Sequence, residues 1–86
     1  MTSKHLPPLY YEYADHLQRW FAQRLPSHVP ASVEVTMAQT LTRTGLTCMP
    51  HFTVRLGDNW IDSHACTADM SAWREETLQH FLAYAQ

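Results

Sequence analysis

The sequence predicts a small α+β domain, a two-layer sandwich whose elements follow the order α-β-β-β-α. Apolar residues recur with helical spacing near both ends of the chain and alternate in the middle, where glycine turns separate three segments. A chain of 86 residues suffices for one domain. We therefore expect one domain over 1–86, a three-stranded antiparallel meander with both helices on one face. Its parts are a flexible lead over 1–8, a helix over 9–25, the sheet over 32–66 and a helix over 69–85.

The first helix is predicted from an apolar stripe with the i, i+3, i+4, i+7 spacing of a helix that packs on a core. Pro7 and Pro8 suit the start of a helix, because proline already has the helical φ and its missing N–H is not needed there. Pro26 ends the helix, since it cannot continue the hydrogen-bond ladder. The stripe consists of Tyr10, Tyr13, Ala14, Leu17, Trp20 and Phe21.

The middle of the chain alternates apolar and polar residues, which is typical of half-buried strands. A turn that ends at Gly45 predicts that Leu41 lies opposite Leu46 in the first hairpin. Pro50 interrupts the second strand, and because proline has no N–H we expect a bulge or break there.

The second hairpin is predicted from Gly57-Asp58, a two-residue turn signal that places Leu56 opposite Asn59. Together the two registers bring the apolar residues of all three strands to one face, which a slip of one residue would not do. That face, which we expect beneath the helices, consists of Val33, Val35, Met37, Leu41, Leu46, Cys48, Phe52, Val54, Leu56, Ile61 and Ala65.

The last segment returns to helical spacing. Asp69 or Ser71 can cap its first turn, because their side-chain oxygens accept hydrogen bonds from free N–H groups. Its apolar stripe consists of Met70, Trp73, Thr77, Leu78, Phe81, Leu82 and Ala85.

The same registers predict which residues point away from the helices. Trp60 would lie opposite Arg55, and these two residue types are enriched at the centres of protein interfaces. The alternative is that Trp60 packs on Arg55 and only braces the hairpin. The predicted partner-binding set is Trp60, Arg55, His51, Thr53, Asp62, His64 and Glu34.

Composition narrows the function classes. A net charge of −2 argues against non-specific binding to nucleic acid. No apolar run approaches the roughly 20 residues that cross a membrane, and the N-terminus lacks the apolar core of a secretory signal. The two cysteines are expected to be free thiols in a reducing compartment, which predicts a cytoplasmic protein. The chain opens with Met and shows no tag, so we expect a complete small gene product.

No catalytic motif or cofactor-binding loop stands out, so we expect neither an enzyme nor a cofactor. The weak candidates for a metal site are Cys48, His51, His64 and Cys66, since zinc favours sulfur and imidazole ligands. The predicted register sends Cys48 to the face opposite the histidines, which disfavours both this site and a disulfide between Cys48 and Cys66.

The order helix, three-strand meander, helix resembles that of double-stranded-RNA-binding domains, as do Pro50-His51-Phe52-Thr53-Val54 and the closing helix with its alanines. The resemblance implies a lysine cluster at the start of the last helix. The matching stretch, 69–76, is acidic and offers only Arg74, so no binding residues carry over and nucleic acid is an unexpected partner.

We therefore expect a non-catalytic protein-binding module that docks through the open sheet face. It would act as an inhibitor, adaptor or assembly factor, as do small proteins of phages and mobile elements that block host defence enzymes. One alternative is a structural homodimer that buries the same face. Another is a metal-binding or degenerate double-stranded-RNA-binding-like domain.

Overall fold

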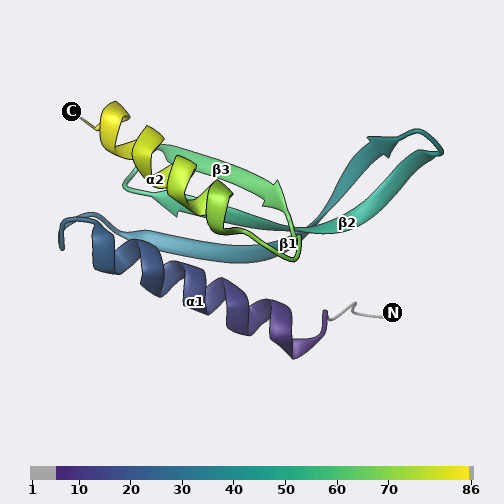
Figure 1. Ribbon diagram of the computed structural model, residues 1–86, viewed down its shortest axis with the longest axis horizontal. Helices are drawn as coiled ribbons and strands as arrows, with labels where there is room; N and C mark the ends of the chain where they lie inside the picture. Colours follow the sequence, from purple (N-terminus) through teal and green to yellow (C-terminus); the bar gives the residue numbers. More distant parts are fainter. Residues whose placement is uncertain (1–5, 86) are drawn as a thin grey trace.

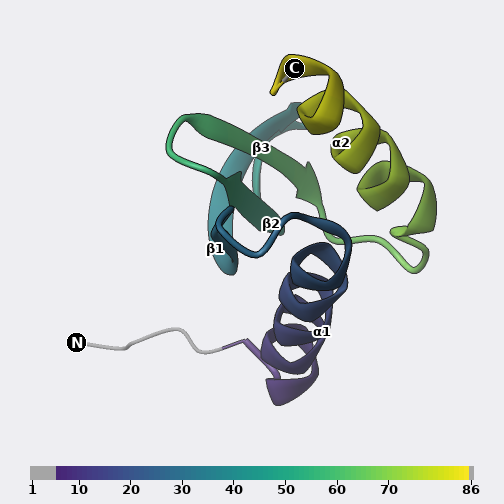
Figure 2. The same cartoon turned by 90° about the vertical axis from the view of Figure 1, so that its left-hand side faces the viewer.

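The computed structural model describes residues 6–85 and confirms the predicted fold class. The elements are α1 (Pro8–Arg24), β1 (Ala31–Thr42), β2 (Gly45–Leu56), β3 (Trp60–Ala65) and α2 (Ser71–Tyr84). The strands form one antiparallel sheet in the order β1-β2-β3. Both helices lie on one side of it, α1 beside β1 and α2 beside β3 (Figures 1 and 2). Most of the predicted lead over 1–8 lies outside the described residues.

The boundaries of α1 follow from its prolines. Pro8 occupies the first turn, where its missing N–H costs nothing. The helix ends at Arg24 because Leu25 precedes Pro26 and is extended, with φ −103° and ψ 156°. The predicted stripe is confirmed, with Ala14, Leu17, Trp20 and Phe21 buried and the two tyrosines packed at the margin of the core.

The first hairpin has the predicted register: Leu41 lies opposite Leu46, Val35 opposite Phe52 and Val33 opposite Val54. Gly45 has a φ of +122°, which suits glycine. The hydroxyl of Thr42 pins the turn, since it donates to the carbonyl of Gly45 at 2.9 Å.

The expected bulge at Pro50 is absent from this hairpin, because residues 31–42 pair one-for-one with residues 45–56. The carbonyl of Pro50 accepts from the N–H of Cys66 at 3.0 Å and therefore points toward the β3 side. In a strand the N–H and C=O of one residue point to the same neighbour. The missing N–H of Pro50 would thus also face the β3 side, just beyond the end of β3, so the β1–β2 ladder loses nothing.

The register predicted for the second hairpin is wrong by one residue. Leu56 lies opposite Trp60, and the turn contains three residues, 57–59. This slip turns Trp60 toward the helices, where its ring packs on Phe81 and Tyr84 with centroid distances of 5.9 and 5.2 Å. Burying a tryptophan removes more apolar area from water than burying the neighbouring isoleucine, so packing on α2 overrides the two-residue turn signal.

Of the two predicted capping residues only Asp69 acts at the start of α2: the N-cap position is Met70, which makes no side-chain capping hydrogen bond, and Ser71 is already the first helical residue. Asp69 accepts a hydrogen bond at its Oδ1 from the N–H of Ser71, the first helical residue, at 2.9 Å. The predicted stripe is confirmed from Met70 to Leu82, whereas Ala85 is exposed.

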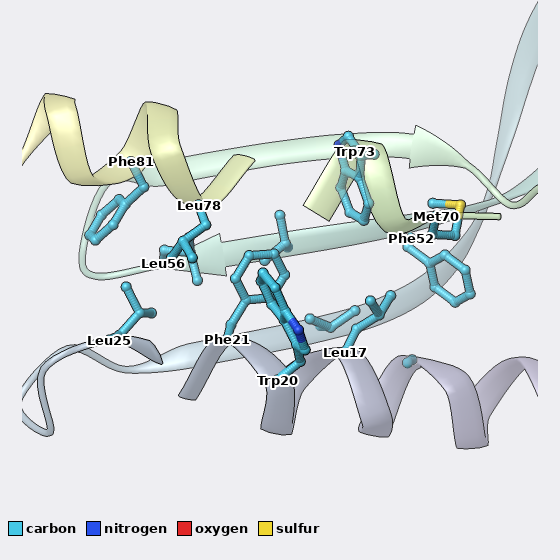
Figure 3. Packing of buried hydrophobic residues seen from close by; sticks show 13 residues of the cluster. Leu17, Trp20, Phe21, Leu25, Phe52, Leu56, Met70, Trp73, Leu78 and Phe81 are labelled. Atoms are coloured by element: carbon cyan, nitrogen blue, oxygen red, sulfur yellow. The ribbon is translucent and has the colours of Figure 1, made fainter. Parts of the chain in front are cut away.

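The core lies between the two helices and the sheet (Figure 3). Burying each large apolar side chain there contributes about 1.5–3 kcal/mol. The core residues are Ala14, Leu17, Trp20, Phe21, Leu25, Val33, Phe52, Val54, Leu56, Met70, Trp73, Leu78 and Phe81.

The far ends of β1 and β2 extend beyond both helices as a two-stranded arm, residues 37–50, at the right of Figure 1. The prediction that this stretch packs beneath the helices is wrong: Leu41 and Leu46 are 78% and 69% exposed, and Met37 and Cys48 are exposed as well. The arm raises the radius of gyration to 14.0 Å, against about 12 Å expected for a compact domain of this length.

Candidate functional site

The surface that sequence reasoning selected is divided by the structure between the two faces of the sheet. His51, Thr53 and Arg55 of β2 and Glu34 of β1 point away from the helices, as predicted. Because β3 is shifted by one residue, its predicted contributors lie on the helix side instead. These misplaced residues are Trp60, Asp62 and His64.

Asp62 binds α2. Its Oδ2 accepts hydrogen bonds from the indole N–H of Trp73 and the hydroxyl of Thr77, both at 3.3 Å. Thr77 is a buried polar residue, so this carboxylate supplies the partner that its hydroxyl needs. Asp62 is therefore a structural link between β3 and α2.

His64 packs on the same tryptophan. Its ring centroid lies 5.6 Å from that of Trp73, and its Nδ1 lies 2.7 Å from the carbonyl oxygen of Ala65. Both contacts are with the protein's own chain, so His64 is held against α2.

The place of the three misplaced residues is taken by Ile61, Ser63 and Ala65. Arg55 lies opposite Ile61, which is 61% exposed. Within residues 6–85 the ion pair that forms is Arg19–Asp15, which leaves Arg55 without a carboxylate partner there. We call this helix-free surface the open face; it comprises Ser32, Glu34, Thr36, Ala38, His51, Thr53, Arg55, Ile61, Ser63 and Ala65.

The open face is supported from beneath. Val54 and Leu56 alternate with Thr53 and Arg55 along β2 and are fully buried on the helix side. The hydroxyls of Thr36 and Thr53 lie 3.4 Å apart across β1 and β2. The exposed side chains of the open face therefore stand on strands fixed by the core, which lowers the entropy cost of binding.

Sequence reasoning missed Ile61 because it assigned Ile61 to the core. The signal that could have found it is the alternation Trp60, Asp62, His64 taken with a turn of three residues instead of two. A local pattern cannot choose between these two turns, since each one gives a regular hairpin.

The structure does not bring the weak metal candidates together. His51 and His64 lie on opposite faces of the sheet, and Cys48 lies on the arm. Over residues 6–85 no group of three or more His, Cys, Asp or Glu side chains could hold a metal ion. Both cysteines are free, as predicted, and burial raises the pKa of the Cys66 thiol.

Arg74 is the one cation in the stretch that matches the lysine cluster of double-stranded-RNA-binding domains, and its side chain packs on another part of the fold. Its guanidinium lies over the ring of Trp20 at 4.7 Å, and Arg24 lies over the same ring at 4.1 Å. Trp20 thus contacts an arginine from each helix, and the contact with Arg74 crosses from α2 to α1 and stabilises their packing.

Two open hollows lie at the margins of the body. One, of about 480 Å³, lies at the base of the arm between Leu9, Tyr13, Phe52 and Cys66. The other, of about 410 Å³, is a groove between α1 and the outer edge of β1, lined by Tyr11, Ala14, Asp15, Gln18, Val33, Glu34 and Val35.

Among the described helices, neither is long and apolar enough to cross a membrane. Comparison with known proteins finds no matching family model, no matching curated protein and no matching solved structure.

Proposed function

We propose that the chain is a small non-catalytic protein-binding module that docks on a protein partner through the open face. The observation that carries this proposal is the pair Arg55 and Ile61, directly opposite each other on a rigid and helix-free surface. Both side chains are exposed. Arginine is enriched among the residues that contribute most to protein interfaces, and the exposed isoleucine beside it adds apolar area that a partner can bury.

The chemistry of the pair indicates the kind of partner. Ile61 suits a shallow apolar pocket, and Arg55 suits a carboxylate at its rim, since a guanidinium binds carboxylates with two parallel hydrogen bonds. Hydroxyl groups surround Arg55 and Ile61 and could form hydrogen bonds with polar groups at the rim of the partner's surface; they belong to Thr36, Thr53 and Ser63. The partner we propose is therefore a folded protein with an acidic residue beside an apolar depression.

Inhibitors, adaptors and assembly factors act by such docking, and we propose a role in this group. We also propose that the protein works in the cytoplasm. Its two free thiols, one of them exposed on the arm, suit a reducing compartment.

The test is affinity capture from a lysate of the source cells or their host, followed by mass spectrometry. Ile61→Asp and Arg55→Glu are compared with wild type, and Leu9→Asp is the matched control. Leu9 is 72% exposed near the start of α1, away from the open face. The three sites are exposed, so circular dichroism is expected to show unchanged folds.

A protein captured by wild type and Leu9→Asp, but lost with Ile61→Asp and with Arg55→Glu, supports docking through the open face. Equal capture by all four chains, loss with Leu9→Asp as well, or capture of nothing by wild type would contradict the proposal.

A further inference from the structure

The outer edge of β1 is the longest unpaired strand edge in the described part of the chain. Main-chain groups of successive strand residues point alternately to the two sides. The N–H of Val33 points away from β2, because it donates to Oε1 of Gln18 on α1 at 3.1 Å. The same side is therefore faced by the N–H and C=O groups of Val35, Met37, Gln39 and Leu41.

This edge is bounded at both ends. The N–H of Val33 already donates to the side chain of Gln18, so pairing with another strand can begin only beyond Val33. At the other end Thr42 pairs with Gly45 in the turn. The free stretch, 35–41, is centred on Ala38 and presents donors and acceptors at equal intervals on either side of that centre.

We infer that a second copy of this chain pairs with this edge, antiparallel and about a two-fold axis at Ala38. In this register Val35 lies opposite Leu41 of the second copy and Met37 opposite its Gln39. Every free main-chain group between the Gln18 contact and the turn then has a partner. The two sheets become continuous, and the β1 edge of neither copy remains open to other strands. This inference does not depend on the proposed function, because Arg55 and Ile61, on β2 and β3, stay uncovered.

The groove beside α1 fits the side chain that this register brings to it. Leu41 of the second copy lies opposite Val35 and on the same side of the sheet. Val35 lines the groove together with Tyr11 and Ala14, and the space measures about 410 Å³. Leu41 is 78% exposed in the single chain, so this contact removes an exposed apolar side chain from water.

Charge complementarity favours the same occupant. Arg43, at the tip, is the single charged residue of the arm. The register places Thr42 of the second copy opposite Glu34, so Arg43 of that copy comes next to Glu34, which lines the groove together with Asp15. Asp15 already pairs with Arg19 at 2.6 Å, whereas Glu34 has no cation partner within residues 6–85. Glu34 stands at the β1 margin of the open face, so it is the carboxylate that Arg43 of the second copy would reach at the strand edge.

The arm also gains order from such pairing. A two-stranded ribbon is marginally stable by itself in water, and three or more strands are usually needed. No residue of the arm is fully buried. Pairing with the second copy gives β1 a neighbour on both sides along the arm.

The first test measures the mass in solution by sedimentation equilibrium at micromolar concentration, and we expect a dimer. Gln39→Pro removes an N–H from the β1 edge, and Cys48→Pro removes one from the outer edge of β2. The two residues are directly opposite in the hairpin, and neither N–H serves the β1–β2 ladder, so they form a matched pair. Gln39→Pro is expected to raise the dimer Kd at least about tenfold, because each copy loses a donor, and Cys48→Pro to leave the Kd unchanged.

The second test reads the register. In a chain with serine at positions 48 and 66, Ala38→Cys places two thiols opposite each other at a non-hydrogen-bonded pair. The Cα separation of such a pair is about 4.5 Å, which lies within the range of a disulfide. We expect Ala38→Cys to form a covalent dimer on mild oxidation. Thr40→Cys is the control, since Thr40 faces Thr36 of the second copy and should stay uncrosslinked.

A third test uses charge and needs no backbone change. Arg43→Glu is expected to weaken the dimer, and Arg43→Glu combined with Glu34→Arg to restore it. A wild-type chain that remains a monomer at these concentrations would overturn the inference. So would a dimer that resists Gln39→Pro, or one that Ile61→Asp dissociates while Gln39→Pro does not, since that dimer would be formed by the open faces.

Discussion

The indole N–H of Trp73 donates a hydrogen bond to Oδ2 of Asp62 at 3.3 Å, and this contact joins the last helix to the edge strand. The hydroxyl of Thr77 donates to the same oxygen. One carboxylate thus satisfies two polar groups of α2, and both would be left without an acceptor if it were removed. Asp62 is therefore a residue of the fold and not of the open face.

Replacing Asp62 tests this role. Asp62→Ala is expected to lower the free energy of unfolding by about 2–3 kcal/mol, because two partly or fully buried donors lose their acceptor. Asp58→Ala, in the exposed turn before β3, is the control and is expected to change stability by less than about 0.5 kcal/mol. Urea denaturation followed by tryptophan fluorescence measures both. An Asp62→Ala chain as stable as the control would show that the link is unimportant.

Trp60 is expected to contribute to stability and not to binding. Trp60→Ala removes the ring that packs on Phe81 and Tyr84, and we expect a loss of about 2–3 kcal/mol, less than for a fully buried tryptophan. Trp60→Phe keeps an aromatic ring and removes an indole N–H that is buried without a partner among residues 6–85, so its effect should stay within about 1 kcal/mol. Thermal unfolding by circular dichroism separates the two variants, and equal losses would contradict this account.

The two thiols are expected to differ in reactivity. Cys48 is exposed on the arm, whereas burial raises the pKa of Cys66 and so lowers its thiolate fraction at pH 8. Iodoacetamide should therefore modify Cys48 first, and the lag of Cys66 should shrink as the pH rises. Mass spectrometry of Cys48→Ser and Cys66→Ser chains over time measures the two rates separately. Faster modification of Cys66 at pH 8 would be inconsistent with the packing at the base of the arm.

The cap of α2 should depend on pH. The N–H of Ser71 and then its hydroxyl hold the pKa of Asp69 below its ordinary value, with a smaller contribution from the charge of Arg74. A lowered pKa means that the folded protein favours the carboxylate. The stabilisation is thus present above the ordinary aspartate pKa and is lost as the pH falls through the pKa of the folded state. Asp69→Ala should lower the Tm at neutral pH, and the difference from wild type should vanish in strong acid. A difference that persists unchanged there would contradict the assignment.

The first hairpin shows how far local pattern can lead. The turn at Thr42–Gly45 and the alternation on either side of it agree on one register, and the structure has that register throughout. The two helices were equally predictable, because their stripes have one clear period and their ends carry proline or a capping residue. Local geometry alone specifies these features.

The sequence by itself therefore determined the element order, the helix faces and the pairing of β1 with β2. Only the tertiary structure decided the pairing of β3, because Gly57-Asp58 and Gly57-Asp58-Asn59 both make sound turns and the choice depends on whether Trp60 or Ile61 meets α2. It also decided that the apolar side of the arm is exposed, since alternation predicts an apolar side but cannot tell how far the helices reach along it. Registers and faces set within a hairpin can be predicted from neighbouring residues, whereas those set by contact with a distant helix require the packed molecule.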